Sequence, residues 1–336
     1  MDNSLKLKIG DIIISCKSKF PLKPLNKSYD WRFSNFVYKG RESPAIRLKI
    51  KVVDRLPKVG EAERLFETIH PVDNADNWRI YKRGGGFVLE QYALHNPGEI
   101  EGIIFLNKDF NQGDVYLSDT DENSFKNINY YEPGAGHRRL KIRDNSSIIR
   151  KDSWSWNSHQ IIYTFLQVLL INYLTQRNGI FFHGTGIKDI DGSGMLFIGP
   201  SGAGKSTMAR LWHRYSRAKI LNDDRMIVRK QNGEYSLYAT PWHGDFKDYL
   251  KSETEPAKLK KILFIYHSKK NSIKNVSNRK AFELMFPNIF PVFWNENKMN
   301  ISSSFCLDLI KEIPCFKLGF RKEREIVRFI RSVSHR

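Results

Sequence analysis

Cysteine is scarce in this sequence. Only three of the 336 residues are cysteines, Cys16, Cys306 and Cys315, and their spacing matches no metal-binding motif. An odd and small number of thiols gives no support to a disulfide framework or to a zinc site. We therefore expect the three thiols to be reduced and structural.

Long hydrophobic runs are also missing. The longest, IIYTFLQVLLINYL (Ile161 to Leu174), is interrupted by Thr164, Gln167 and Asn172. It is shorter than the roughly 20 apolar residues that a membrane-spanning helix needs, so it predicts a buried helix. The first residues, MDNSLKLKIGD, lack the pattern of a signal peptide. We expect a cytoplasmic protein with no membrane span.

Acidic residues are few relative to basic ones: 36 Asp and Glu against 55 Lys and Arg give a formal net charge of +19. Such a surface favours anionic partners, among them nucleotides, acidic proteins and nucleic acid. The basic residues are scattered and form no stretch interleaved with aromatic residues, so nucleic-acid binding is not expected. Hydrophobic residues at 40% and charged residues at 27% are typical of a folded globular chain, and the length favours two domains.

Residues 1–150 are predicted to form a β-rich domain, which is a candidate for substrate binding. Short alternating segments separated by turns are typical of an antiparallel sheet. The glycines Gly84 to Gly86 are interpreted as a hairpin turn, because no strand-then-helix pattern surrounds them. The turn-rich stretch from Asn129 to Ser147 is expected to mark the domain boundary. The six clearest strand segments are DIIISCKS, RLKIKVV, WRIYKR, GGFVLEQY, EGIIFL and DVYLSD.

Residues 151–336 alternate between strand and helix patterns, which predicts an α/β unit of two or three layers. A helix is expected from about Trp156 to Leu174, and predicted strands at GIFFHGTGI and MLFI follow it. Farther along the chain, KILFIYHS and CFKLGF are predicted strands and NRKAFELMF is a predicted helix. A final basic helix is expected from Glu323.

The segment from Gly199 to Ser206, GPSGAGKS, matches the phosphate-binding pattern G-x-x-x-x-G-K-[ST] in full. An apolar run precedes it and a helical pattern, TMARLWHRY, follows it, as the motif requires. The glycines allow successive backbone N–H groups to face a polyphosphate, and the start of the helix adds a partial positive charge. A tight glycine turn that caps a helix is the alternative, and it would not require Lys205. The residues predicted to bind ATP, with GTP as an alternative, are Gly199, Ser201, Gly202, Ala203, Gly204, Lys205, Ser206 and Thr207.

A histidine, His183, lies on the predicted strand before this loop. If DIDGSG is a hairpin turn, the flanking strands pair antiparallel about a centre near Asp191 and Gly192. Such a pairing, with residue numbers that sum to about 383, places His183 opposite Pro200 at the mouth of the loop. There the imidazole could contact a phosphate or orient an acid. A partly buried strand histidine bonded to a backbone carbonyl is an equally weighted alternative.

Two aspartates, Asp223 and Asp224, lie between apolar runs in AKILNDDRMIV. One aspartate at a strand end near a phosphate loop usually helps to hold magnesium. Adjacent side chains of an extended segment point in different directions, so the second carboxylate can face an incoming hydroxyl. Beside a protonatable imidazole that carboxylate can stay ionised and accept the hydroxyl proton during phosphoryl transfer. A polar hairpin turn is the alternative, and the phosphate loop favours the site over the turn.

These features together resemble the HPr kinase/phosphorylase family: His-Gly before a hairpin, the phosphate loop, and Asp-Asp-Arg after an apolar strand, over roughly Gln160 to Gly244. The resemblance implies a phosphate-loop kinase core of the α/β type shared with phosphoenolpyruvate carboxykinase. It implies transfer of the γ-phosphate of ATP to a serine hydroxyl. It also implies that Ser206 and Asp223 bind Mg²⁺. Asp224 would be the general base, and His183 would keep it ionised.

The chain departs from that family at one place. The glycine-rich signature LEIRGLG, which contributes to magnesium binding and dephosphorylation in the bifunctional enzyme, is absent, and about there the chain has YATPWHGDFKD (Tyr238 to Asp248). Phosphorylase activity and the carrier protein as substrate are therefore not expected. Relatives without the signature include enzymes that phosphorylate a precursor peptide, so a protein or peptide hydroxyl is the expected acceptor. Within the substituted segment, Thr240, His243 and Asp245 are further candidates for contact with metal or acceptor.

Other functions stay open from the sequence alone. One is a small-molecule kinase of the same fold, and another is a phosphate-loop ATPase or switch protein whose acceptor is water. The second aspartate with a histidine favours the hydroxyl kinase, because a water-activating ATPase more often has glutamate at that place. A carboxykinase acting on an organic acid is a third alternative, but no clear arginine pair for the acid is present. The oligomeric state is open, and a homo-oligomer is compatible with the sequence.

Overall fold

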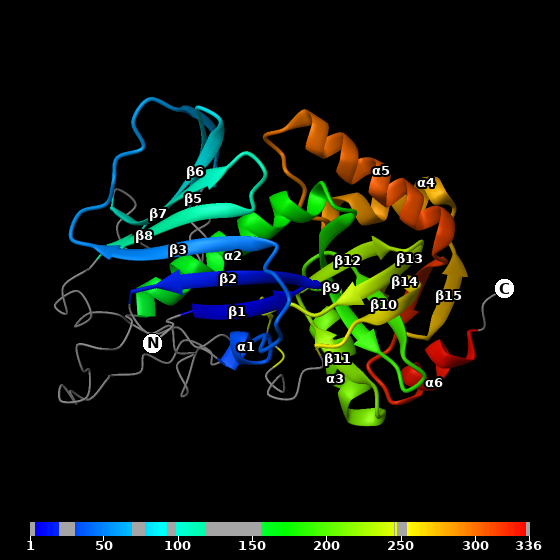
Figure 1. The fold of residues 1–336 in the computed structure, drawn as a ribbon. Coiled ribbons are helices and arrows are strands. Elements are labelled where there is room, and N and C mark those ends of the chain that lie inside the picture. Colours follow the sequence, from blue (N-terminus) through cyan, green and yellow to red (C-terminus); the bar gives the residue numbers. More distant parts are fainter. Residues whose placement is uncertain are drawn as a thin grey trace. The chain divides into compact units, whose positions relative to one another are not determined.

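The computed structural model of the chain describes residues 4–19, 31–68, 78–92, 99–118, 156–244, 246 and 254–333, and its fold is mixed α/β with two large sheets (Figure 1). The chain divides into two compact units. The predicted boundary after residue 150, and the turn-rich stretch that suggested it, lie outside the described residues, so this boundary stays a prediction. The first unit consists of Met1–Leu5, Ser15–Leu22 and Ala45–Leu170, and the second of Lys6–Ile14, Lys23–Pro44 and Ile171–Arg336.

The first sheet has eight strands in the order β1-β2-β3-β8-β7-β6-β5-β4. All six predicted strands are present in it, whereas β1 and β4 are not among the segments that the sequence predicts. Arg83 pairs with Gly86, so Gly84 and Gly85 form the predicted hairpin turn between β5 and β6. The bounds are β1 Ser4–Ile9, β2 Ile12–Ser18, β3 Ile46–Val53, β4 Glu63–Glu67, β5 Trp78–Arg83, β6 Gly86–Tyr92, β7 Ile100–Asn107 and β8 Gln112–Ser118.

One strand pair differs from the predicted antiparallel arrangement. β3 and β8 run parallel, with Ile50 opposite Val115. Parallel neighbours need a long connection, and the strands β4 to β7 lie between β3 and β8 in the chain and supply it. Alternation of apolar and polar residues predicts which face a side chain takes, but not the direction of the neighbouring strand.

The second sheet has the order β10-β9-β12-β13-β14-β16-β15, and β11 pairs with β9. β10 also pairs with β14, so β10, β9, β12, β13 and β14 form a closed ring of paired strands. The pairs β10–β14 and β14–β16 are parallel, which brings the carboxyl ends of these three strands to one edge. The bounds are β9 Gly179–Lys188, β10 Ser193–Ile198, β11 Lys219–Asn222, β12 Arg225–Gln231, β13 Glu234–Tyr238, β14 Ala257–His267, β15 Ser272–Asn275 and β16 Cys315–Phe320.

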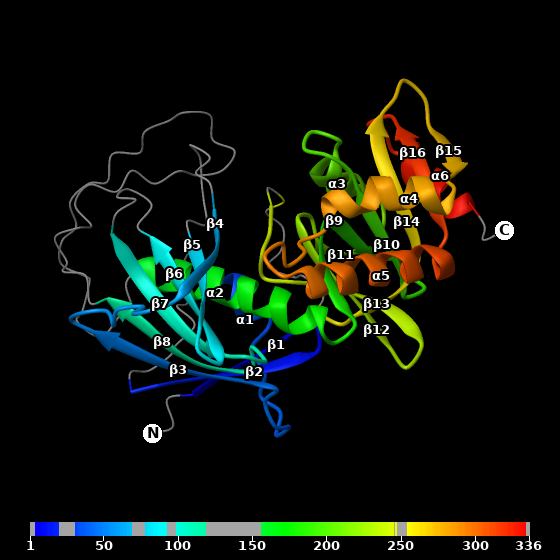
Figure 2. The same ribbon diagram turned by 90° about the horizontal axis from the view of Figure 1, so that it is seen from above.

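Within the second unit, α3 and α6 lie on one side of the sheet and α4 and α5 on the other, which gives three layers (Figures 1 and 2). The sequence pattern predicts α2, α3, α4 and α6 but not α5, whose apolar residues recur less regularly. No helix in the described part of the chain is long and apolar enough to cross a membrane. The bounds are α1 Trp31–Ser34, α2 Trp156–Thr175, α3 Lys205–Tyr215, α4 Asn278–Met285, α5 Glu296–Glu312 and α6 Glu325–Ser332, with a 3-10 turn at Phe286–Asn288.

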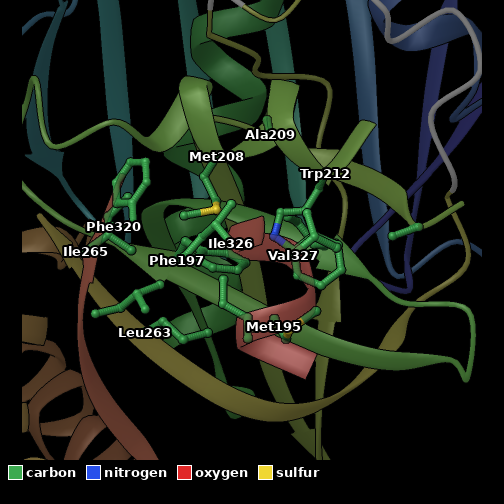
Figure 3. Packing of buried hydrophobic residues seen from close by; sticks show 14 of the residues in the cluster. Met195, Phe197, Met208, Ala209, Trp212, Leu263, Ile265, Phe320, Ile326 and Val327 are labelled. Carbon is green, nitrogen blue, oxygen red and sulfur yellow. The ribbon is translucent and has the colours of Figure 1, made fainter. Parts of the chain in front are cut away.

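A buried hydrophobic cluster fills the space between this sheet and the pair α3 and α6 (Figure 3). Met195 and Phe197 are two residues apart on β10 and therefore face the same side. Trp212 of α3 packs against them, with its ring centroid 6.4 Å from that of Phe197. Ile326 and Val327 of α6 complete the contact. This packing holds α3 against the sheet and so fixes the segment that leads into it.

β9 and β10 form the predicted hairpin, but their register is shifted by one residue from the predicted one. The turn has three residues, 190–192, and Gly192 ends it with a positive φ of 81°. With three turn residues the hairpin is centred on Asp191 and not between Asp191 and Gly192. The sequence pattern does not specify whether the number of turn residues is odd or even. Continued by one pair beyond Gly184 and Ile198, this register brings His183 level with Gly199 and not with Pro200. On the other edge of β9, His183 pairs with Arg225 of β12.

Candidate functional site

β11 and β12 both pair with β9, one after the other along its length. β11 pairs with the second half of β9 and β12 with the first half, and the aspartates Asp223 and Asp224 lie at the break between them. The N–H of Gly184 on β9 donates to the carbonyl oxygen of Asp224 at 3.0 Å. Gly184 also pairs with Ile198, the last residue of β10. The break therefore places the acidic pair at the end of β10, where the loop 199–206 begins.

The side chain of Asn222 sets the conformation of this break and has no exposed surface. Its Oδ1 accepts hydrogen bonds from the N–H groups of Asp224 at 2.8 Å and Arg225 at 3.2 Å. Its Nδ2 donates to the carbonyl oxygens of Thr240 at 2.8 Å and Trp242 at 3.0 Å. An asparagine that accepts from the backbone two residues farther on forms an Asx turn. Asn222 therefore ties the acidic pair to the segment that follows β13.

We expect Asn222→Ala to lower the free energy of unfolding by about 2–4 kcal/mol, because buried backbone groups on both sides of the break lose their partner. Asn275→Ala, at an exposed position of β15, is the matched control and should change stability by about 0.5 kcal/mol or less. Urea unfolding of both variants measures the difference. Equally small losses would show that the bonds of Asn222 do not stabilise the break.

The loop 199–206, whose last two residues form the start of α3, follows β10 with the strand–turn–helix geometry that the sequence predicts. Gly202 and Gly204 have positive φ values of 77° and 99°, a region that favours glycine. A Cβ on Gly204 would lie 2.6 Å from Cζ of Phe320, so this position has no room for a side chain. The first N–H groups of a helix have no intrahelical acceptor, and α3 therefore presents donors suited to an anion at the end of this loop.

Lys205 is buried at the start of α3 and is 8% exposed. Its ammonium group donates to the carbonyl oxygens of Gly199 at 2.8 Å and Pro200 at 3.1 Å. Burial lowers the pKa of Lys205, while the carboxylates of Asp224 and Asp223 act in the opposite direction. Both aspartates therefore lie close enough to the loop for their charges to reach the ammonium group.

Asp223 is 2% exposed and points toward the loop and the segment after β13. Its Oδ1 accepts from the N–H of Gly244 at 2.8 Å and its Oδ2 from the N–H of Phe246 at 3.0 Å. Burial raises the pKa of Asp223, and these two backbone donors and the hydroxyl of Ser206 partly offset that rise. The structure thus brings together Ser206 and Asp223, the two residues predicted to bind magnesium.

Asp224 contacts two cationic or protonatable side chains. Nε2 of His183 lies 3.0 Å from its Oδ1, and Nη1 of Arg225 lies 2.7 Å from its Oδ2. Burial by itself would raise the pKa of Asp224, but the hydrogen bond with His183 and the charges of Arg225 and Lys205 hold it below its ordinary value. The guanidinium group of Arg225 also lies 4.4 Å from the ring centroid of Phe290. Asp224 is therefore a fixed carboxylate that stays ionised at neutral pH.

This lowered pKa predicts how stability depends on pH. A carboxyl group with a lower pKa in the folded chain stabilises the fold above its unfolded pKa of about 3.9, and this contribution is lost as the pH falls through the folded pKa. We expect the contribution of the Asp224 carboxylate, measured as the difference in unfolding free energy between the wild type and Asp224→Asn, to decrease as the pH falls below about 4. Urea unfolding of both proteins between about pH 6 and pH 2 measures it. A difference that stays the same across the acidic range below about pH 4 would contradict the lowered pKa.

The structure adds participants that the sequence interpretation does not assign. Arg225 follows the acidic pair directly in the sequence, and this position could have identified it as a member of the site. The N–H donors of Gly244 and Phe246 are backbone groups far along the chain and carry no side-chain signal. Among the further candidates, Thr240 donates its hydroxyl to the carbonyl oxygen of Arg225 at 2.6 Å and so supports the break. His243 is partly buried, and Asp245 lies outside the described residues.

The donor set at Ser206 and Asp223 suits Mg²⁺. Among the described residues, no group of three or more His, Cys, Asp or Glu side chains could hold a metal ion. Mg²⁺ is usually bound by one or two protein oxygen ligands, and phosphate oxygens and water complete its coordination. A hydroxyl and a carboxylate side by side at the end of a loop with anion-binding geometry match that pattern.

Comparison with known proteins gives one family match. A solved structure, the HPr(Ser) kinase/phosphatase from Coxiella burnetii, is similar over 46% of this chain and 87% of that chain, with 9% sequence identity and a TM-score of 0.27, too low to support an argument about fold or function. No curated protein matches the chain. A family model described as SynChlorMet cassette protein ScmC matches residues 151–323, more than half of the 336 residues, and this range includes the loop, His183 and both aspartates. The chain belongs to the family of SynChlorMet cassette protein ScmC.

Proposed function

We propose that this protein is a kinase that transfers the γ-phosphate of ATP to a hydroxyl group, namely a serine hydroxyl of a protein or peptide. The observation that carries the proposal is the 3.0 Å contact between Nε2 of His183 and Oδ1 of Asp224 beside the loop 199–206. An anion-binding loop alone would suit many nucleotide-binding proteins. A fixed, ionised carboxylate next to that loop adds a group that can accept the proton of an acceptor hydroxyl.

In this proposal the loop 199–206 belongs to a phosphate-loop kinase core and holds the triphosphate. The backbone N–H groups of the loop and of the first turn of α3 donate to phosphate oxygens. Lys205 exchanges its bonds to the carbonyl oxygens of Gly199 and Pro200 for bonds to the outer phosphates. Ser206 and Asp223 would hold Mg²⁺, which would neutralise charge on the phosphates.

The roles of the remaining residues follow from their contacts. The hydroxyl oxygen attacks the γ-phosphorus, the bond between that phosphorus and the ADP oxygen breaks, and Asp224 accepts the hydroxyl proton. His183 and Arg225 each bond to one oxygen of Asp224 and fix its orientation. A carboxylate oxygen can accept two hydrogen bonds, so both contacts leave Asp224 able to bind the acceptor hydroxyl. Phosphorylase activity is not part of the proposal, because the chain has YATPWHGDFKD where the LEIRGLG signature would lie.

The proposal is tested by incubating the protein with γ-labelled ATP, Mg²⁺ and the products of genes encoded beside it, followed by mass spectrometry. The matching family is described as a cassette protein, which makes products of the same cassette the first acceptors to test. Phosphate on a serine of one of these products is the expected result. Label found only as inorganic phosphate would make the protein an ATPase, and label on a metabolite would make it a small-molecule kinase.

A further inference from the structure

A pocket lies in the second unit at the end of α3 opposite to the loop 199–206. Its volume is about 560 Å³. α3 has 11 residues, and at a rise of about 1.5 Å per residue its two ends are roughly 16 Å apart. The pocket is therefore separate from the candidate site for phosphoryl transfer. Its lining includes Arg214, Arg217, Arg324, Arg331, Ile190 and Tyr215.

One of the four arginines is already neutralised. Nε of Arg331 lies 2.9 Å from Oδ2 of Asp189, and its guanidinium group lies 5.3 Å from the ring centroid of Trp212. These contacts hold the Arg331 side chain in place at the edge of the pocket. In contrast, Arg214, Arg217 and Arg324 are exposed, and none of them forms an ion pair with a carboxylate in the part of the chain that the structure describes.

Three neighbouring guanidinium groups repel one another unless an anion lies between them. They present planar donor pairs that match the two oxygens of a carboxylate or a phosphate. The pocket therefore favours a ligand with several negative charges. This preference of the pocket does not depend on the proposed nucleotide site.

The apolar part of the pocket distinguishes among such ligands. Ile190, at the tip of the β9–β10 hairpin, is 69% exposed, which leaves an aliphatic surface beside the arginines. Single-stranded nucleic acid gains affinity by stacking its bases on aromatic rings. The aromatic ring of the pocket, that of Tyr215, already has the guanidinium group of Arg214 over it at 5.4 Å. A chain that alternates carboxylates with an aliphatic side chain fits this combination better than a base or an inorganic anion does.

We propose that this pocket binds an acidic peptide segment, with carboxylates paired to Arg214, Arg217 and Arg324 and an aliphatic side chain against Ile190. As a docking site for the phosphate acceptor the pocket rests on the proposed kinase function, whereas peptide binding itself does not. An extended chain advances at most about 3.5 Å per residue, so at least about five residues would separate the acidic segment from the acceptor hydroxyl.

The test measures binding without nucleotide, by fluorescence anisotropy, to a fluorescein-labelled peptide of glutamate, leucine and serine. The same peptide with glutamine in place of glutamate is the ligand control. The pocket variant combines Arg214→Gln, Arg217→Gln and Arg324→Gln. The matched variant combines Arg210→Gln, Lys322→Gln and Arg328→Gln, which remove the same charge from exposed positions outside the pocket. We expect the pocket variant to bind the acidic peptide at least about tenfold more weakly than the wild type, and the matched variant to bind it within about threefold.

Several outcomes would overturn the proposal. Equal loss of affinity in both variants would mean that net charge alone attracts the peptide, and equal binding of the glutamine peptide would mean that carboxylates are not recognised. Stronger binding of a single-stranded oligonucleotide that only the pocket variant loses would assign the pocket to nucleic acid. Peptide binding in Lys205→Ala separates this proposal from the kinase function, because that variant removes a residue of the loop and none of the pocket. Retained binding there supports the pocket whatever the transfer assay shows.

Discussion

Asp224→Asn is expected to slow phosphate transfer to the acceptor by about 10²–10⁴-fold while changing the affinity for ATP by less than about twofold. The amide has the size of the carboxylate, and its oxygen can still accept from Nη1 of Arg225, which lies 2.7 Å from Oδ2 of Asp224. It cannot take up the hydroxyl proton. The transfer rate at saturating acceptor and a separate calorimetric titration with ATP give the two quantities.

Asp308→Asn serves as the control for this substitution. Asp308 lies on α5, where it is exposed and paired with Lys311. Its replacement by asparagine is the same chemical change, made away from the site. We expect the control to transfer phosphate at the wild-type rate. If Asp224→Asn is as active as this control, the base lies elsewhere and the assigned role of the His183–Asp224 pair is wrong.

Lys205→Ala is expected to abolish detectable phosphate transfer and to weaken ATP binding by about 10–100-fold. A charge-assisted hydrogen bond contributes about 1.5–3 kcal/mol, and the ammonium group would make such bonds to the outer phosphates. The transfer assay and calorimetry measure both effects. Retained turnover would remove the assignment of the loop 199–206 to phosphate binding.

Loss of folding has to be separated from loss of phosphate contacts in this variant. Lys205 is buried and bonded to two carbonyl oxygens of its own loop, so alanine also removes contacts within the protein. Lys205→Met keeps the aliphatic stem and serves as the second variant. Lys274→Ala, at an exposed position of β15, is the surface control. A melting temperature close to that of the wild type in Lys205→Met, together with loss of transfer, would assign the effect to the ammonium group.

Local patterns in the sequence predict much of the second unit. The apolar strand, the glycine-rich turn and the helical pattern of residues 195–215 each depend on neighbouring residues, and β10, the loop and α3 follow them in order. The hairpin before the loop is local too, which is why only its register differs. The proximity of His183 to Asp224 could be inferred because both segments had to flank the same loop.

Long-range features could not be predicted in the same way. The parallel pairing of β3 with β8 joins segments that many residues separate, and nothing within either strand specifies the direction of its partner. The role of Asn222 depends on carbonyl oxygens of Thr240 and Trp242, whose positions only the folded chain defines. The same holds for the backbone donors to Asp223. Side-chain chemistry in the sequence predicts which groups can react, whereas the main-chain groups that orient them emerge from topology.

The bonds of Lys205 within its own loop bear on which anions can compete for it. The ammonium group has three N–H donors and already gives two of them to the carbonyl oxygens of Gly199 and Pro200, so a phosphate ligand can use only one donor of Lys205 unless these bonds are exchanged. The measured affinity is then the difference between two sets of partners. In the proposed nucleotide site, a ligand with one phosphate group is expected to compensate poorly for exchanged bonds, whereas a triphosphate would also accept from the N–H groups at the start of α3. The internal bonds of Lys205 are therefore expected to disfavour free phosphate relative to a triphosphate.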